Sequence, residues 1–140
     1  MRRIVLIIDD EPVVAKAIHR LLREVLPRSW EVAQETNATI GLSRAVLEED
    51  VEIAIVDLLM PGMKGDTLVE QVIRQRPEMR GRIILCTGAV ISDALAVRLF
   101  DDLGCLRLDK PFLLETLEAL IWNLVESPLT RRPKPPPSAA

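Results

Sequence analysis

Five polar side chains in this sequence directly follow apolar runs, and together they could bind a metal ion and a phosphoryl group. An acidic pair, Asp9-Asp10, follows the first run, and Asp57 follows another. Thr87 and Lys110 stand at the corresponding places after two later runs. Carboxylates without a neighbouring histidine form the oxygen ligand set that Mg²⁺ prefers. A carboxylate can also accept a phosphoryl group, while an ammonium group and a hydroxyl neutralise and hydrogen-bond its oxygens.

Each of these residues, taken alone, has a simpler interpretation. An acid before a helix often caps it, which would account for either Asp9 or Asp10. Thr87 and Lys110 are, singly, ordinary residues for the end of a strand. Two adjacent acids with a third, Asp57, at the end of another strand favour a metal site over helix capping. The prediction therefore depends on the combination.

The segments that position these side chains alternate between short apolar runs and longer stretches of helical period. The runs predict strands at residues 4–8, 30–33, 53–56, 82–86 and 105–108. The periodic stretches predict helices at about residues 11–26, 37–49, 66–75, 92–103 and 113–125. This alternation is typical of an α/β fold with doubly wound (βα)5 order, a five-stranded parallel sheet with helices on both faces. Ligands of such sheets bind beyond the carboxyl ends of the strands, where the polar side chains would meet.

Length and composition indicate one domain followed by a tail. The chain has 140 residues, of which 49% are hydrophobic, and this is enough for one buried core. We expect residues 1–126 to form that domain. Residues 127–140 are rich in proline, so we expect a disordered tail or the stub of a linker.

The charge pattern and the cysteines narrow the class of protein further. The formal net charge is −3 and no basic stripe with interleaved aromatic residues occurs, so we expect no direct binding to nucleic acid. Cys86 and Cys105 lack metal-type spacing and lie in apolar runs, which predicts buried, reduced thiols. The first apolar run is too short for a signal peptide, and no later run reaches membrane-spanning length. We therefore expect a cytoplasmic protein without a membrane partner.

Four motifs follow one another along the chain: Asp9-Asp10, a D-x-x-M-P-x-x-x-G run at residues 57–65, Thr87-Gly88, and Lys110-Pro111-Phe112. With these motifs, in this order, the chain resembles the receiver domain of bacterial response regulators over about residues 3–126. The resemblance implies a flavodoxin-like fold and a phosphorylation switch of a two-component system or phosphorelay. Such a phosphoprotein promotes only its own phosphorylation and dephosphorylation and is not otherwise an enzyme.

The resemblance also implies roles for the acids. Asp57 would be the phosphoacceptor, forming an aspartyl phosphate with a phosphoryl group from a histidine kinase or a phosphotransfer protein. Asp10, Asp57 and the backbone carbonyl of Leu59 would hold Mg²⁺ directly, and Asp9 would bind it through water. Mg²⁺ is therefore the expected cofactor.

The remaining motifs would act on the phosphoryl group itself. By the same resemblance, Lys110 would pair with its oxygens, and Thr87 and Gly88 would bind it, with Thr87 turning toward it. The peptide bond between Lys110 and Pro111 would be cis, a form that proline tolerates at modest cost.

One position departs from the family's pattern. The family usually has Tyr or Phe three residues before the lysine, and this chain has Arg107. We therefore expect the usual aromatic coupling to be missing between the phosphorylated site and the surface of the fourth helix, fifth strand and fifth helix. That surface is a candidate for binding an unknown downstream protein or for forming a dimer, with Arg107 and Trp122 as candidate contacts.

Two side chains on helices have simple interpretations. Trp122 lies off the apolar stripe of the last helix, so it either covers the flank of its own helix or contacts a partner. His19 is the only histidine, and we expect it to be a solvated surface residue. The expected stripe consists of Leu113, Leu117, Leu120, Ile121 and Leu124.

Several other functions are compatible with a phosphate-related α/β fold. A haloacid-dehalogenase-like phosphatase would need a D-x-D motif after the first strand, where this chain has Asp9-Asp10-Glu11. A flavodoxin-like FMN module would need a loop rich in Ser, Thr and Gly there, because acids repel phosphate. A pseudo-receiver or scaffold, which binds partners without phosphorylation, would have lost an acid, Thr87 or Lys110. The sequence leaves open the kinase, the stimulus, the oligomeric state, and whether this is a single-domain protein or a module of a longer chain.

Overall fold

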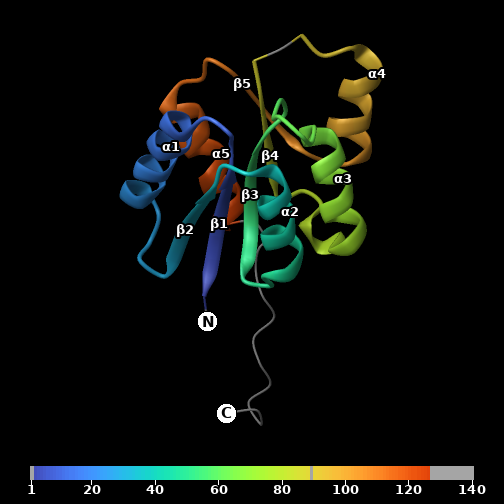
Figure 1. The fold of residues 1–140 in the computed structure, drawn as a ribbon. Helices are drawn as coiled ribbons and strands as arrows, with labels where there is room; N and C mark the ends of the chain where they lie inside the picture. The colour runs from blue at the N-terminus through green and yellow to red at the C-terminus, as the bar shows by residue number, and fades with distance from the viewer. Residues whose placement is uncertain (1, 89, 127–140) are drawn as a thin grey trace.

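The computed structural model describes residues 2–88 and 90–126, which form a parallel sheet covered by helices (Figure 1). The strand order is β2-β1-β3-β4-β5, so the sheet is doubly wound and the predicted fold class is confirmed. The predicted tail, residues 127–140, lies outside the described residues. The strands are β1 (Arg3–Ile8), β2 (Trp30–Glu35), β3 (Val51–Asp57), β4 (Ile83–Thr87) and β5 (Leu106–Asp109). The helices are α1 (Pro12–Val25), α2 (Ala38–Leu47), α3 (Gly65–Gln75), α4 (Asp93–Ala96) and α5 (Leu114–Glu126), with a 3₁₀ turn η1 (Pro77–Met79) and a π-helical segment η2 (Val97–Asp102).

The central strands are buried along most of their length. Every residue of β3 is buried, and β1 is buried from Ile4 to Ile8. All four strand pairings are parallel. Because helices cover both faces of a parallel sheet, its inner strands need continuous apolar runs, and this explains why the sequence pattern located β1 and β3. The edge strand β2 extends past its predicted end at Ala33 to Glu35, because Gln34 and Glu35 pair with Ile7 and Ile8 of β1.

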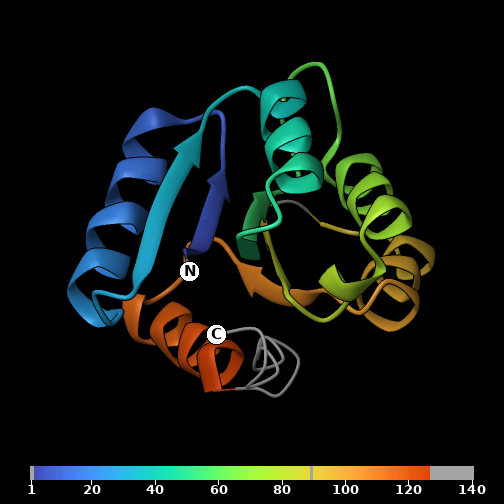
Figure 2. The ribbon, with the colours of Figure 1, turned by 90° about the horizontal axis from the view of Figure 1, so that it is seen from below.

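The helices divide between the two faces of the sheet (Figure 2). One face carries α1 and α5, whose buried residues form a core with the apolar residues of the strands. The other face carries α2, α3 and the helix formed by α4 and η2, and it has a core of its own. No helix among residues 2–88 and 90–126 combines the length and the apolarity needed to cross a membrane. Both cysteines are buried free thiols.

One detail of the predicted helices was wrong and another was incomplete. The predicted fourth helix is present, but from Val97 to Asp102 it has the wider turns of a π-helix. At the end of this helix, the guanidinium of Arg80 donates hydrogen bonds to the carbonyls of Asp101 and Asp102. Arg80 belongs to a distant segment, so the hydrophobic periodicity of the helix could not predict this contact. In the last helix, Leu113 does not belong to the core stripe, since α5 begins one residue later and Leu113 is exposed.

A buried arginine joins the ends of two helices on the second face. Arg76 follows α3 and is 8% exposed, and its guanidinium donates hydrogen bonds to the backbone carbonyls of Ala45, Glu48 and Glu49. These carbonyls lie at or just beyond the end of α2, where a helix leaves its last acceptors without internal partners. Arg76 also forms an ion pair with Glu78, at 3.0 Å. Arg76 therefore holds the end of α2 against the end of α3.

Replacing Arg76 with Ala is expected to lower the free energy of unfolding by about 2–3 kcal/mol, because buried carbonyls would lose a charged donor. Urea denaturation at neutral pH measures this change. Arg74→Ala is the matched control, since Arg74 is 68% exposed and only pairs with Glu70 at 3.7 Å. We expect that control to cost about 0.5 kcal/mol or less. Equal costs for the two variants would contradict the anchoring role of Arg76.

Candidate functional site

The strand order brings the predicted site residues to one edge of the sheet. β1 and β3 are neighbours, yet the chain leaves them toward opposite sides, so the switch point of this sheet lies between them. Asp9 and Asp10 follow β1, and Asp57 is the last residue of β3. The carboxylates expected from the sequence to be close are therefore on adjacent strand ends.

Four carboxylates cluster at this switch point. One ligand oxygen from each of Asp9, Asp10, Glu11 and Asp57 lies within 4.8 Å of the others. Asp9 and Asp57 are buried, whereas Asp10 is half-buried and Glu11 is exposed. The backbone N–H of Glu11 donates to Asp9 Oδ1 at 2.9 Å, which fixes the turn after β1. Glu11 is an addition to the predicted metal-binding residues. The feature of the sequence that could have indicated it is its position directly after two acids.

Lys110 reaches this cluster from the end of β5. Its Nζ lies 3.3 Å from Asp9 Oδ2 and 3.5 Å from Asp57 Oδ2, so one ammonium group bridges two buried carboxylates. The backbone N–H of Lys110 donates to the carbonyl of Thr87 at 2.7 Å, which ties this residue to the end of β4. The peptide bond between Lys110 and Pro111 is cis.

The electrostatics of the cluster favour a bound cation. The pKa of Asp57 is raised from 3.8 to about 6, mainly by burial and also by the charge of Asp9, while Lys110 acts in the opposite direction. For Lys110, burial alone would lower the pKa, but the charges of Asp9 and Asp57 together raise it above its ordinary value. A single ammonium group thus compensates the carboxylates only in part. A divalent cation among them would remove the remaining repulsion.

The loop after β3 holds Asp57 in place through its backbone. The N–H of Leu59 donates to Asp57 Oδ1 at 3.3 Å, and the N–H of Gly65 donates to the carbonyl of Leu58 at 2.8 Å. A Cβ atom on Gly65 would lie 2.7 Å from the carbonyl oxygen of Asp57. Gly65 is therefore needed where α3 begins against the end of β3. The side chain of Leu59 is 58% exposed beside the site.

The residues after β4 lie next to the acid cluster. Thr87 ends β4 and is buried, and Gly88 follows it with a Cβ position 3.5 Å from Lys110 Cβ. β4 pairs with β3 so that Asp57 lies opposite Cys86, the residue before Thr87. Thr87, Gly88 and Lys110 are thus neighbours across adjacent strand ends.

The other residues singled out in the sequence lie away from the carboxylates. Arg107 is exposed on β5, where its Nε donates to Asp109 Oδ1 at 2.8 Å. Trp122 is half-buried on α5. His19, expected to be a solvated surface residue, is half-buried, and its Nδ1 lies 2.9 Å from Gln34 Oε1. Gln34 belongs to the edge strand β2, which ends beside α1. The helical periodicity of the sequence could not predict this contact between a strand and a helix.

The fold and this edge define a doubly wound α/β domain with an acid cluster and a lysine at its switch point. Residues 5–121 match the family model of the response regulator receiver domain. The chain therefore belongs to this family of two-component signalling domains.

Its similar proteins include sensor kinases. The sensor histidine kinase TmoS of Ectopseudomonas mendocina is 30% identical over 121 residues, which cover 86% of this chain and 12% of that protein. The sensor kinase CckA of Brucella abortus is 27% identical over 125 residues, which cover 87% of this chain and 12% of that protein. The chain thus spans only a small part of these kinases.

Solved receiver domains share the fold. A response regulator receiver domain from Clostridium thermocellum has a TM-score of 0.73 and 26% identity, covering 88% of this chain and 94% of that one. A CheY-like receiver domain protein from Methanospirillum hungatei has a TM-score of 0.72 and 25% identity, covering 90% of this chain and 96% of that one.

Proposed function

We propose that this receiver domain is a Mg²⁺-dependent phosphorylation switch with Asp57 as its phosphoacceptor. The observation that carries the proposal is the placement of Asp57 within one acid cluster and 3.5 Å from the Nζ atom of Lys110. Membership in the family supports it as well. The phosphatase alternative gains no support, since the acids after β1 form no D-x-D motif. The FMN module gains none either, since these acids would repel an FMN phosphate.

In the proposed reaction, a carboxylate oxygen of Asp57 attacks the phosphorus of a phosphohistidine. The new O–P bond forms as the N–P bond breaks, and the electron pair of that bond stays on the imidazole nitrogen. Such transfers depend mainly on alignment and on neutralising the charge of the phosphoryl oxygens. Lys110 supplies one positive charge, and Thr87 and the backbone at Gly88 lie where they can donate hydrogen bonds.

The acid cluster fits a magnesium ion by its chemistry. All four side chains offer oxygen ligands, and the described residues place no histidine in the cluster. Asp10, Asp57 and the carbonyl of Leu59 would hold the ion directly, and Asp9, already paired with Lys110, would bind through water. When bound, the ion would neutralise phosphoryl oxygens as transfer proceeds.

The proposed partners follow from the same chemistry. The donor would be a histidine kinase or a phosphotransfer protein, and the phosphorylated domain would then bind a downstream protein in the cytoplasm. We place the switch in residues 1–126, with residues 127–140 as tail or linker, and assign it no catalysis beyond its own phosphorylation and dephosphorylation. The surface of α4, β5 and α5, with Arg107 and Trp122, is the proposed face for a target or a second copy.

The test is labelling of the purified protein with radioactive acetyl phosphate, with Mg²⁺ and with excess chelator. We expect one acid-stable, base-labile phosphate per chain with Mg²⁺, and almost none with chelator, because the acyl phosphate needs charge neutralisation. The absence of labelling with Mg²⁺, from both acetyl phosphate and a phosphorylated histidine donor, would instead support the pseudo-receiver alternative.

A further inference from the structure

A small, mainly apolar pocket lies between two loops at the edge of the sheet that carries the acid cluster. Leu58 and Leu59 of its lining follow β3, and Val90, Ile91 and Leu95 follow β4. The pocket has a volume of about 160 Å³. Pockets for small-molecule ligands usually have about 300–1,000 Å³. This pocket therefore fits one aliphatic side chain rather than a whole ligand.

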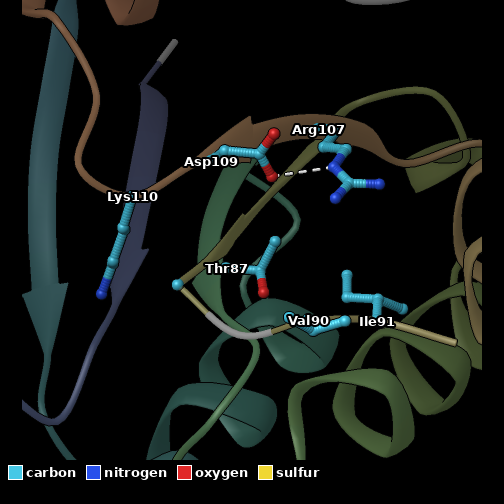
Figure 3. Close-up of a pocket in the computed structure, with 7 residues that line it drawn as sticks. Thr87, Val90, Ile91, Arg107, Asp109 and Lys110 are labelled. Carbon is cyan, nitrogen blue, oxygen red and sulfur yellow. Dashed lines mark hydrogen bonds and ion pairs between the residues drawn. The ribbon is translucent and has the colours of Figure 1, made fainter.

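The apolar side chains at this pocket are more exposed than a folded core requires. Val90 is fully exposed and Leu59 is 58% exposed. Figure 3 shows Val90 and Ile91 beyond Thr87, on the side away from Lys110. Neighbouring apolar side chains that stay in contact with water often mark a place where another protein binds. The fold itself thus leaves part of this lining uncovered.

Lys64 adds a positive charge to the lining of the pocket. It is the residue just before α3, and its side chain makes no capping hydrogen bond. A lysine cannot cap a helix in this way, because its ammonium group has no acceptor, and the helix dipole disfavours a cation there. Lys64 is exposed and forms no ion pair within residues 2–88 and 90–126. Helix formation gives no reason for a lysine here, whereas binding of an acid would.

We propose that this pocket is a docking site for a segment of another protein that carries an aliphatic side chain and a carboxylate within one helical turn. The aliphatic side chain would enter the pocket against Leu59 and Val90, and the carboxylate would pair with Lys64. Asp66 also lines the pocket, but it lies in the first turn of α3, where the helix dipole favours an acid. The inference goes beyond the proposed function, because this docking needs neither Mg²⁺ nor phosphate.

The chain's own C-terminal segment does not match this chemistry. Residues 127–140 contain three basic side chains and no acidic one, so Lys64 would repel them. The matching segment therefore belongs to a separate protein. Because Leu58 and Leu59 directly follow Asp57, a protein docked in this pocket would lie beside the proposed phosphorylation site.

The first test selects peptides from a random library displayed on phage, with the full chain and Lys64→Glu as parallel targets and without Mg²⁺. Peptides selected by the wild type should share Leu, Ile or Met with an Asp or Glu at most four residues away. Those selected by Lys64→Glu should carry Lys or Arg in place of the acid, since the charge at the pocket is reversed.

The second test measures the affinity of the selected wild-type peptide, synthesised with a fluorescent label, by anisotropy. Lys64→Gln should weaken binding about two- to fivefold, as expected for the loss of an exposed ion pair. It should have no effect on a second peptide in which the acid is replaced by its amide. Lys16→Gln removes another exposed lysine, in α1, and is the matched control.

The apolar part of the site has its own pair of variants. Val90→Ser should weaken binding of the same peptide about threefold or more, because an apolar contact is lost. Val90 is fully exposed, so this change removes no core contact. Leu47→Ser changes another exposed apolar side chain, in α2, and should leave the affinity unchanged.

The outcomes separate the inference from the proposed function. The same consensus sequence for wild type and Lys64→Glu would overturn the docking site, and so would equal losses in Lys64→Gln for the acidic peptide and its amide. A selection without any peptide that is sensitive to Val90→Ser would also overturn it. A chain that takes up no phosphate from acetyl phosphate would overturn the phosphorylation switch and leave the docking site intact.

Discussion

Replacing Asp57 with Asn is expected to abolish Mg²⁺-dependent labelling by acetyl phosphate. The amide of Asn cannot form an acyl phosphate. Among the other described carboxylates of the cluster, only Asp9 is buried and next to Lys110, and it follows a different strand. The measurement is radioactive phosphate per chain after a fixed incubation with Mg²⁺. Retained labelling above a small fraction of the wild type would mean that another residue is the acceptor.

Loss of labelling in Asp57→Asn will not reflect unfolding. The pKa of Asp57 is raised from 3.8 to about 6, so the charged form is disfavoured in the folded protein. A raised carboxyl pKa destabilises the fold as pH rises through the interval from 3.8 to 6, and this cost is fully present at neutral pH. Without Mg²⁺ at pH 7, Asp57→Asn should therefore unfold at the same temperature as the wild type or higher. Asp66→Asn, an acid of α3 outside the cluster, should keep normal labelling.

Replacing Lys110 with Ala is expected to slow labelling by about 100-fold at fixed acetyl phosphate, which is the usual effect of losing one charge-stabilising donor. Lys110 is the only described ammonium group in contact with Asp57. Initial rates of labelling with saturating Mg²⁺ measure the effect. Lys16→Ala removes an exposed lysine of α1 and serves as the matched control.

The same substitution should also change stability in a way that depends on metal. Without Lys110, the carboxylates of Asp9 and Asp57 would lie together without their ammonium partner. We expect a loss of about 1–3 kcal/mol in the free energy of unfolding without Mg²⁺, and partial recovery with Mg²⁺. Normal labelling together with unchanged stability would show that Lys110 neither balances the acids nor serves the transfer.

The sequence predicted that these polar side chains lie close together because they stand at strand ends. A parallel sheet brings the carboxyl ends of its strands to one edge, so Asp10, Asp57 and Lys110 were expected to be close without any knowledge of loop shapes. The start of α2 is equally local, since the side chain of Asn37, the residue just before the helix, accepts the N–H of Ile40 at 2.9 Å. Local patterns of this kind are present in the order of residues.

Contacts between distant segments were not predictable in this way. Nothing in the sequence singles out Arg76, because only the packing of α2 against α3 gives its guanidinium backbone carbonyls to bind. The pairing of Lys110 with Asp9 depends on the order of strands across the sheet. The residues of η2 would also suit an α-helix, so neither composition nor hydrophobic periodicity predicts its π-helical turns.

The direction of the strands also governs how this domain can be joined to others. β1 starts at Arg3, and α5, which returns across the sheet, ends at Glu126 near the same pole of the molecule (Figure 1). The acid cluster occupies the opposite pole. A polypeptide fused to either end would therefore leave the acid cluster accessible to the proposed phosphoryl donor, and reporter proteins could be attached at both ends without shielding Asp57.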